Sequence, residues 1–126
     1  MISIRDFSFI SYQFNKKNEV GEKMIFVTYW ELNTDFDPSE LAEIAQKILS
    51  KGLWPSPGIK TLAWYITPEY WGITVAEAES EEALMKDANL WRIAKPGIFK
   101  VLKSSPAMKT EEVLPLMVQL KKKLTG

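Results

Sequence analysis

The chain has 126 residues, and its 46% hydrophobic and 25% charged residues are typical of one globular domain. Sixteen basic residues balance sixteen acidic ones, so the composition does not favour binding to nucleic acid. The absence of cysteine and histidine excludes thiol nucleophiles, disulfides, histidine bases and metal or haem sites ligated by these residues. Carboxylate, lysine, arginine, tyrosine and hydroxyl groups remain, and we expect no cofactor and no metal site.

The sequence also gives expectations about membranes and location. No stretch approaches the roughly 20 apolar residues that span a bilayer. The N-terminal residues alternate in polarity, whereas a signal peptide has a continuous apolar core. We therefore expect a cytoplasmic protein that does not enter a membrane. The basic run at 121–123 falls in the last turn of a predicted helix, where it complements the helix dipole.

Residues 1–23 differ in character from the rest of the chain. Their first part is rich in Phe and Ile and alternates, and the remainder is polar. Two interpretations stay open: an edge strand that pairs with Met24–Glu31, or an appendage that the fold does not need. The apolar content favours the ordered edge strand.

The next part of the chain predicts a strand followed by a helix. Met24–Glu31 is rich in β-branched and aromatic residues at both alternating sets of positions, which predicts a central strand covered on both faces. Asp37 and Pro38 are typical of an N-cap and a first helical position, and an apolar stripe follows until Gly52. We expect Trp54, in the proline-rich connection, to lie under the sheet edge.

A β-hairpin is predicted next. Its strands are Ile59–Thr67 and Trp71–Glu79, joined by a tight turn at 68–70. One carboxylate, Glu77, interrupts the apolar pattern of the second strand. The aromatic residues that crowd the tip of the hairpin are Trp64, Tyr65, Tyr70 and Trp71.

A second helix and a fourth strand follow the hairpin. Ser80 is the predicted N-cap of the helix, which ends at 95–97. Ile98–Ser105 then predicts a strand that Pro106 closes.

Thr110–Leu124 predicts a terminal helix. A proline deep inside a helix clashes with the carbonyl four residues earlier. Because of Pro115, either the regular helix begins near Glu112 or the helix is kinked.

The order from Met24 is strand, helix, strand, strand, helix, strand, which is the split βαββαβ, ferredoxin-like arrangement. It predicts an α+β fold with a four-stranded antiparallel sheet, helices on one face, and Met24–Glu31 and Trp71–Glu79 as central strands. Residues 1–23 are then an N-terminal extension, 24–105 the ferredoxin-like domain, and 106–126 the C-terminal helix of that domain. Both sheet faces are apolar, so we expect a homodimer through the second face unless residues 1–23 cover it.

Two short motifs, FVTYW at 26–30 and VAEA at 75–78, together with this order, carry a resemblance. The region from Met24 to Ser105 resembles a domain-of-unknown-function family of small proteins in the dimeric α+β barrel superfamily. The resemblance implies that two sheets pack face to face and form a barrel between protomers. Superfamily members include cofactor-free monooxygenases, isomerases of small ring compounds and haem enzymes. The haem branch uses a histidine ligand, and this chain has no histidine, so the resemblance does not imply a haem site.

Glu77 is the candidate catalytic residue. If it faces the barrel cavity, desolvation would make it a plausible general base. Alternatively, it faces solvent at the strand end or pairs with Lys100 or Lys103.

A set of aromatic residues, together with the hydroxyl group of Thr28, is the candidate ligand site. Aromatic linings with a few polar groups are typical of small-molecule pockets. Packing in the core or in a dimer interface is the alternative for each residue. The set comprises Thr28, Tyr29, Trp30, Trp64, Tyr65, Tyr70, Trp71 and Trp91.

Three functions follow from these expectations. The first is a homodimeric binding module for a small apolar or aromatic ligand. The second is a cofactor-independent, oxygenase- or isomerase-like enzyme with Glu77 as base and Tyr29 or Tyr65 orienting the substrate. The third is a dimer whose role is interaction without chemistry. A cavity, and the direction in which Glu77 points, separate the three.

Overall fold

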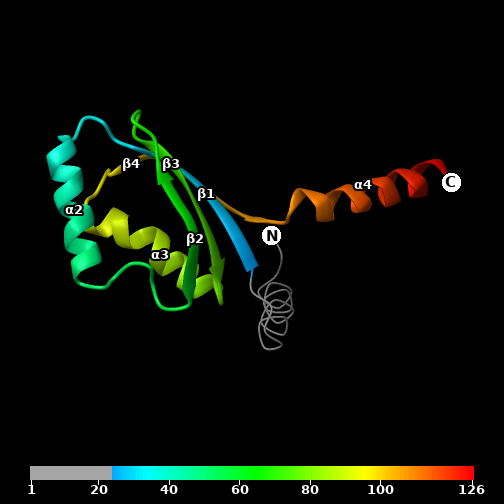
Figure 1. Ribbon diagram of the computed structural model, residues 1–126, viewed down its shortest axis with the longest axis horizontal. Helices are drawn as coiled ribbons and strands as arrows, with labels where there is room; N and C mark the ends of the chain where they lie inside the picture. The colour runs from blue at the N-terminus through cyan, green and yellow to red at the C-terminus, as the bar shows by residue number, and fades with distance from the viewer. Residues whose placement is uncertain (1–23) are drawn as a thin grey trace, which may run out of the picture.

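The computed structural model describes residues 24–126, and the predicted N-terminal strand lies outside them. The element order is that of a split βαββαβ fold followed by a terminal helix, which confirms the α+β, ferredoxin-like prediction (Figure 1). The elements in chain order are β1 (Met24–Leu32), α2 (Pro38–Ser50), β2 (Ile59–Ile66), β3 (Trp71–Ala78), α3 (Glu81–Ala94), β4 (Phe99–Ala107) and α4 (Thr110–Thr125).

The four described strands form one sheet in the order β2-β3-β1-β4, and every neighbouring pair is antiparallel. The predicted central position of the first and third strands is therefore confirmed. Val27 of β1 stands opposite Val75 of β3 on one side and opposite Ser105 of β4 on the other.

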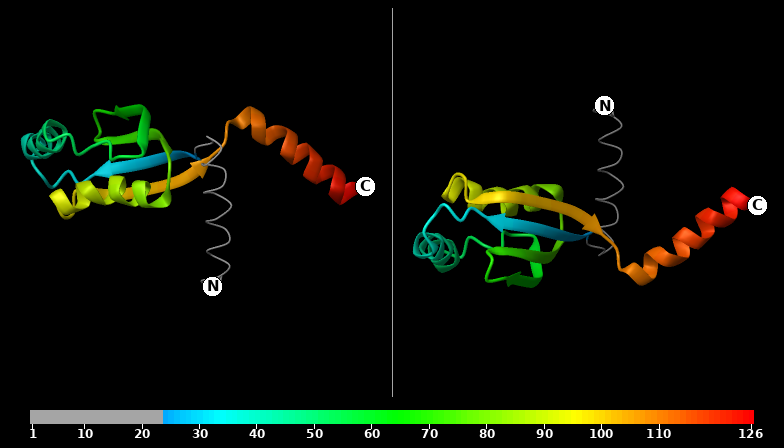
Figure 2. Two further views of the ribbon diagram at one scale, coloured as in Figure 1. Left: turned by 90° about the horizontal axis from the view of Figure 1, so that it is seen from below. Right: turned by 90° about the horizontal axis from the view of Figure 1, so that it is seen from above.

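Two helices cover one face of the sheet. Helices α2 and α3 lie on the same side of it, whereas none of the described helices covers the opposite face (Figures 1 and 2). We call this second face the open face. Helix α4 extends away from the end of β4, and none of its residues is buried.

The alternation along β3 defines the two faces. Every second residue is buried beneath the helices, and the residues between them are half-buried or exposed on the open face. The buried set is Gly72, Thr74, Ala76 and Ala78. The open-face set is Trp71, Ile73, Val75 and Glu77.

Both predicted helix caps are present. The carboxylate of Asp37 accepts a hydrogen bond of 2.9 Å from the backbone N–H of Ser39 and begins α2. The hydroxyl of Ser80 accepts one of 3.1 Å from the backbone N–H of Ala83 and begins α3. These local signals fix how the two covering helices enter the fold.

One predicted boundary near the C-terminus is wrong, whereas the predicted span of the terminal helix is confirmed. Strand β4 continues through Pro106, which stands opposite Phe26, because an edge strand tolerates a residue without an N–H group. Helix α4 begins at Thr110, as predicted, and continues past Pro115 as one element, so the alternative start near Glu112 does not apply. The helix begins at Thr110 because the N–H groups of Glu112 and Val113 both donate to the carbonyl of Lys109.

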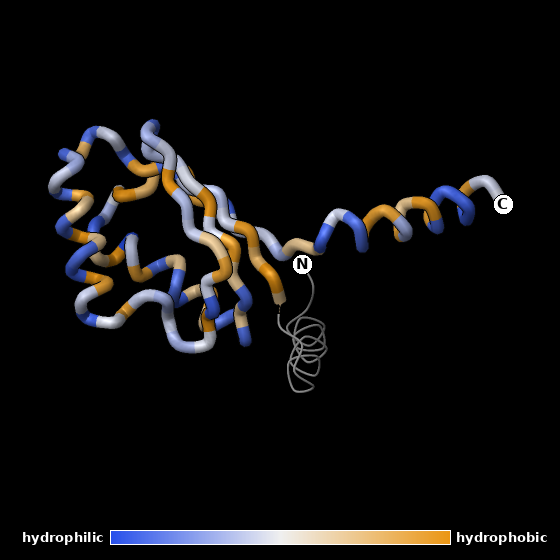
Figure 3. Tube along the Cα trace, in the orientation of Figure 1, coloured by the Kyte–Doolittle hydropathy of each residue, from blue (hydrophilic) through white to orange (hydrophobic). Residues whose placement is uncertain are grey.

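Apolar residues are distributed over all the layers. Figure 3 shows hydrophobic stretches in the strands, on the sheet-facing helices and also along the projecting α4. Within residues 24–126, no helix combines the length and the apolar character needed to cross a membrane.

Candidate functional site

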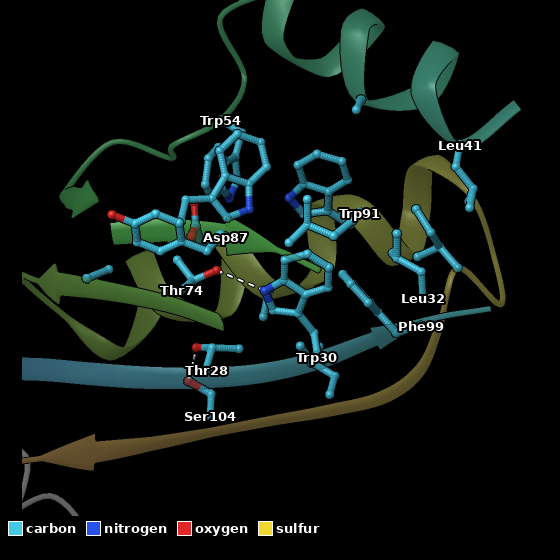
Figure 4. Close-up of a pocket in the computed structure, with 18 of the residues that line it drawn as sticks. Thr28, Trp30, Leu32, Leu41, Trp54, Thr74, Asp87, Trp91, Phe99 and Ser104 are labelled. Atoms are coloured by element: carbon cyan, nitrogen blue, oxygen red, sulfur yellow. Dashed lines mark hydrogen bonds between the residues drawn. The ribbon is translucent and has the colours of Figure 1, made fainter. Parts of the chain in front are cut away.

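A cavity of about 460 Å³ lies between the sheet and the helices α2 and α3. This volume is in the range of small-molecule sites, about 300–1,000 Å³. All four described strands and both covering helices contribute to its lining, which is mostly apolar. Figure 4 shows the principal side chains, which include Trp30, Trp54, Thr74, Asp87 and Trp91.

Trp30 forms the base of the cavity. Its side chain is 7% exposed, and its indole N–H donates a hydrogen bond of 3.0 Å to the hydroxyl of Thr74. Phe99 lies beside it, with ring centroids 6.5 Å apart. Gly72 leaves room for the indole, since an added Cβ there would lie 2.5 Å from a Trp30 ring carbon. The polar atom of Trp30 is thus satisfied, and its ring is held in place.

Three further tryptophans form a cluster at the cavity. Trp54 comes from the connection between α2 and β2, Trp64 from β2 and Trp91 from α3. The ring centroid of Trp54 lies 4.4 Å from that of Trp64 and 5.8 Å from that of Trp91. The Trp64 and Trp91 centroids are 6.3 Å apart. These tilted and edge-on contacts are favourable aromatic geometries, so they stabilise the three rings against one another at this side of the cavity.

Asp87 is the charged member of the lining. It lies one helical turn before Trp91 on α3, so both side chains are on the same helix face. Its carboxylate accepts a hydrogen bond of 2.8 Å from the backbone N–H of Ser56. Burial raises the pKa of Asp87, and hydrogen bonds from Ser56 and from the side chain of Trp54 oppose that rise.

No cation in the described part of the chain compensates this carboxylate. The ion pairs between described residues join Lys86 to Glu82 and Lys95 to Glu40, and neither involves Asp87. Residues 24–126 also contain no group of three or more acidic side chains that could hold a metal ion. The charge of Asp87 is therefore unpaired within this region.

The raised pKa of Asp87 predicts a pH-dependent difference in stability between wild type and Asp87→Asn. A raised pKa means that the folded chain binds this proton more tightly than the unfolded chain does. The resulting stabilisation is complete below the unfolded pKa, near 3.8, and is lost as pH rises through the folded value. We expect Asp87→Asn, which keeps the acceptor for Ser56, to melt higher than wild type at pH 7.

Thermal unfolding of both proteins from pH 3 to pH 7 measures this difference. The gain at pH 7 should be less than about 5 °C, because water screens the half-buried carboxylate. The gap should close towards pH 3. A variant that melts well below wild type at pH 7 would contradict the expectation and identify the charge as stabilising.

A pair of hydroxyl groups supplies the second polar feature of the cavity. Thr28 of β1 and Ser104 of β4 stand directly opposite each other, and their side-chain oxygens are 2.9 Å apart. In Figure 4 this pair lies below Trp30, with Trp54 and Asp87 above. Two polar groups thus lie at different parts of an apolar lining, as in sites that orient a ligand.

Most of the ligand-binding residues predicted from the sequence line this cavity. They are Thr28, Trp30, Trp64, Tyr65, Tyr70 and Trp91. Tyr65 is 68% exposed, which places it at the rim. Tyr29 and Trp71 instead lie on the open face, with ring centroids 5.9 Å apart, and the Tyr29 hydroxyl donates to Glu31. The alternation of the strands separates them from Thr28, Trp30 and Trp64, which point to the helix-covered face.

Glu77 does not belong to the cavity. It lies on the open face of β3, opposite Ile25 of β1 and Lys60 of β2. The basic residue opposite it in the sheet register is thus on β2, whereas the sequence suggested Lys100 or Lys103. Its role as a base stays a prediction.

Several lining residues were missed or given another role in the sequence analysis. Trp54 was expected only to pack under the sheet edge, where it is indeed buried. Asp87 was not singled out, although it lies within the apolar stripe formed by Leu84, Ala88 and Trp91. A carboxylate in such a stripe is the signal that identifies it. Thr74, Phe99 and Ser104 carried no comparable signal.

Comparison with known proteins gives one match. A protein-family model described as "Domain of unknown function (DUF3303)" matches residues 24–121. This stretch contains the four described strands, both covering helices and the described residues that line the cavity. No curated protein and no solved structure matches significantly.

Proposed function

We propose that this chain, which belongs to the DUF3303 family, binds a small, largely apolar ligand with a flat or aromatic body between its sheet and its helices. The observation that carries the proposal is the cavity of about 460 Å³, lined mainly by apolar and aromatic side chains with a few polar groups. This combination is typical of small-molecule sites.

The exposure of the lining supports an occupant. The cavity opens to solvent, and its lining residues Trp64 and Tyr65 are 42% and 68% exposed. A ligand that fills the space shields this apolar surface from water, which is favourable.

The tryptophans provide a direct test of binding. Four of the five lie at the cavity, and the fifth, Trp71, lies on the open face. In a Trp71→Phe background, all tryptophan fluorescence therefore reports on the cavity. We expect tert-butylbenzene, a compact aromatic hydrocarbon, to change this emission saturably.

A cavity-filling substitution supplies the specificity control. Ala88→Leu places a larger side chain in the cavity and should weaken binding of tert-butylbenzene at least tenfold. Ala94→Leu makes the same change at an exposed position on the same helix and should leave the affinity unchanged. Equal affinity in the two variants, or no saturable signal in the Trp71→Phe protein, would refute the proposal.

We also propose that two copies of the chain associate through the open face. This face carries a row of apolar side chains, among them Val27, Ile73 and Val75, beyond the reach of α2 and α3. Helix α4 projects beyond the sheet and exposes Met117 and Leu120. A second copy supplies a matching apolar face and a surface on which α4 can rest, and a two-fold contact buries both.

The alternative prediction, a cofactor-independent enzyme with Glu77 as base, requires a ligand on the open face. The cavity beneath the helices does not bring a ligand to Glu77. Only a space enclosed between two sheets would do so. Binding in the cavity is therefore the function that we favour.

A further inference from the structure

The described lining of the cavity carries one acidic side chain and no basic one. Among residues 24–126, Asp87 is the only charged residue of the lining, and no lysine or arginine from this part of the chain contributes. A carboxylate that is partly removed from water is unfavourable unless a cation or several hydrogen bonds compensate it. No described residue provides the cation.

The contacts of Asp87 with the loop supply hydrogen bonds but no positive charge. The carboxylate accepts from the backbone N–H of Ser56 and thereby joins α3 to the connection before β2. Hydrogen bonds from the side chains of Ser56 and Trp54 also favour its ionised form. No described residue neutralises the carboxylate, so its negative charge can attract a cationic group.

The tryptophan cluster adds a second, independent preference for positive charge. The face of an indole ring carries negative electrostatic potential and attracts cations, more strongly than tyrosine or phenylalanine does. The ring centroids of Trp54 and Trp91 are 5.8 Å apart, and Asp87 lies near Trp54 (Figure 4). The aromatic rings and the carboxylate thus favour the same kind of group at one end of the cavity.

We propose that the ligand is an organic ammonium ion, whose charged nitrogen lies between the Asp87 carboxylate and the Trp54–Trp91 pair and whose apolar body extends towards Trp30. This inference rests on the proposed function, because it names the class of ligand that the same cavity binds. The hydroxyl groups of Thr28 and Ser104, below Trp30, remain available for a polar group at the far end of the ligand. An anionic ligand would be repelled by Asp87, and no basic residue of the described lining offsets this repulsion.

A pair of isosteric probes tests the charge preference. Phenyltrimethylammonium and tert-butylbenzene have nearly the same shape and differ by one positive charge. We expect the full-length Trp71→Phe protein to bind the charged probe at least tenfold more tightly than the neutral one. With Asp87→Asn added, the preference for the charged probe should fall to about threefold or less.

The outcomes separate this inference from the proposed function. Binding of tert-butylbenzene with no preference for the charged probe would overturn the ammonium assignment and leave the cavity as a binding site. An unchanged preference in Asp87→Asn would also overturn it, because the carboxylate would then play no part. Failure of both probes to bind would refute the proposed function itself.

Discussion

Gly72→Ala is expected to lower the free energy of unfolding by about 3 kcal/mol or more, which corresponds to a fall in Tm of about 12 °C or more. A Cβ at this position would lie 2.1 Å from the backbone carbonyl oxygen of Tyr65 and 2.5 Å from a ring carbon of Trp30. Neither neighbour can move cheaply, because one is the backbone of β2 and the other is a buried indole. Thermal and urea unfolding measure the loss.

Gly52→Ala is the matched control for this effect. Gly52 has a positive φ of 66°, which disfavours alanine, but an added Cβ would meet nothing within 4 Å. We expect a loss of about 1–2 kcal/mol there, from backbone strain alone. If Gly72→Ala lowered the free energy of unfolding no more than Gly52→Ala does, this result would contradict the close packing of Gly72 against Trp30 and Tyr65.

Val27→Glu is expected to convert a dimer into a monomer. Val27 lies in the middle of β1 on the open face, between Val75 and Ser105, and is 39% exposed in the single chain. A glutamate there can stay hydrated in a monomer. In a two-fold dimer it would bury two like charges without partners, which costs several kcal/mol.

Sedimentation at micromolar concentration distinguishes these states. Wild type should have twice the 14.4 kDa mass of the chain, and Val27→Glu should have the single mass with an unchanged circular dichroism spectrum. Val27→Thr, which adds polarity but no charge, should remain dimeric. A monomeric wild type, or a folded Val27→Glu dimer, would rule out association through the open face.

The sequence predicted the architecture where local patterns decide it. The caps at Asp37 and Ser80 and the breaks near Gly52 and Gly97 define both covering helices. The tight turn after Thr67 defines the hairpin. Together with the apolar strands, these signals led to the correct element order and the correct central strands.

The orientation of the strands could not be predicted in the same way. In β1, both alternating sets are largely apolar, so the pattern does not tell which set faces the helices. Thr28 and Trp30 therefore could not be distinguished from Tyr29, and Glu77 could not be assigned to a face. The boundary at Pro106 was misplaced because a proline ends a central strand but not an edge strand.

The candidate site was only partly visible in the sequence for a related reason. Its aromatic residues are conspicuous, but the cavity exists because segments distant in the chain converge. Trp54, Trp64 and Trp91 come from a connection, a strand and a helix. In the sequence, Asp87 looks like any other acidic residue. Only the fold shows that it lines the same cavity as the three tryptophans.

Native mass spectrometry of the chain purified from its own host tests the central claim, that the cavity holds a small ligand, most directly. Wild type and Ala94→Leu should each carry an added mass of a few hundred daltons or less, which denaturation releases. Ala88→Leu, purified in the same way, should lack it. No added mass on any of the three proteins, or the same added mass on all of them, would contradict the account.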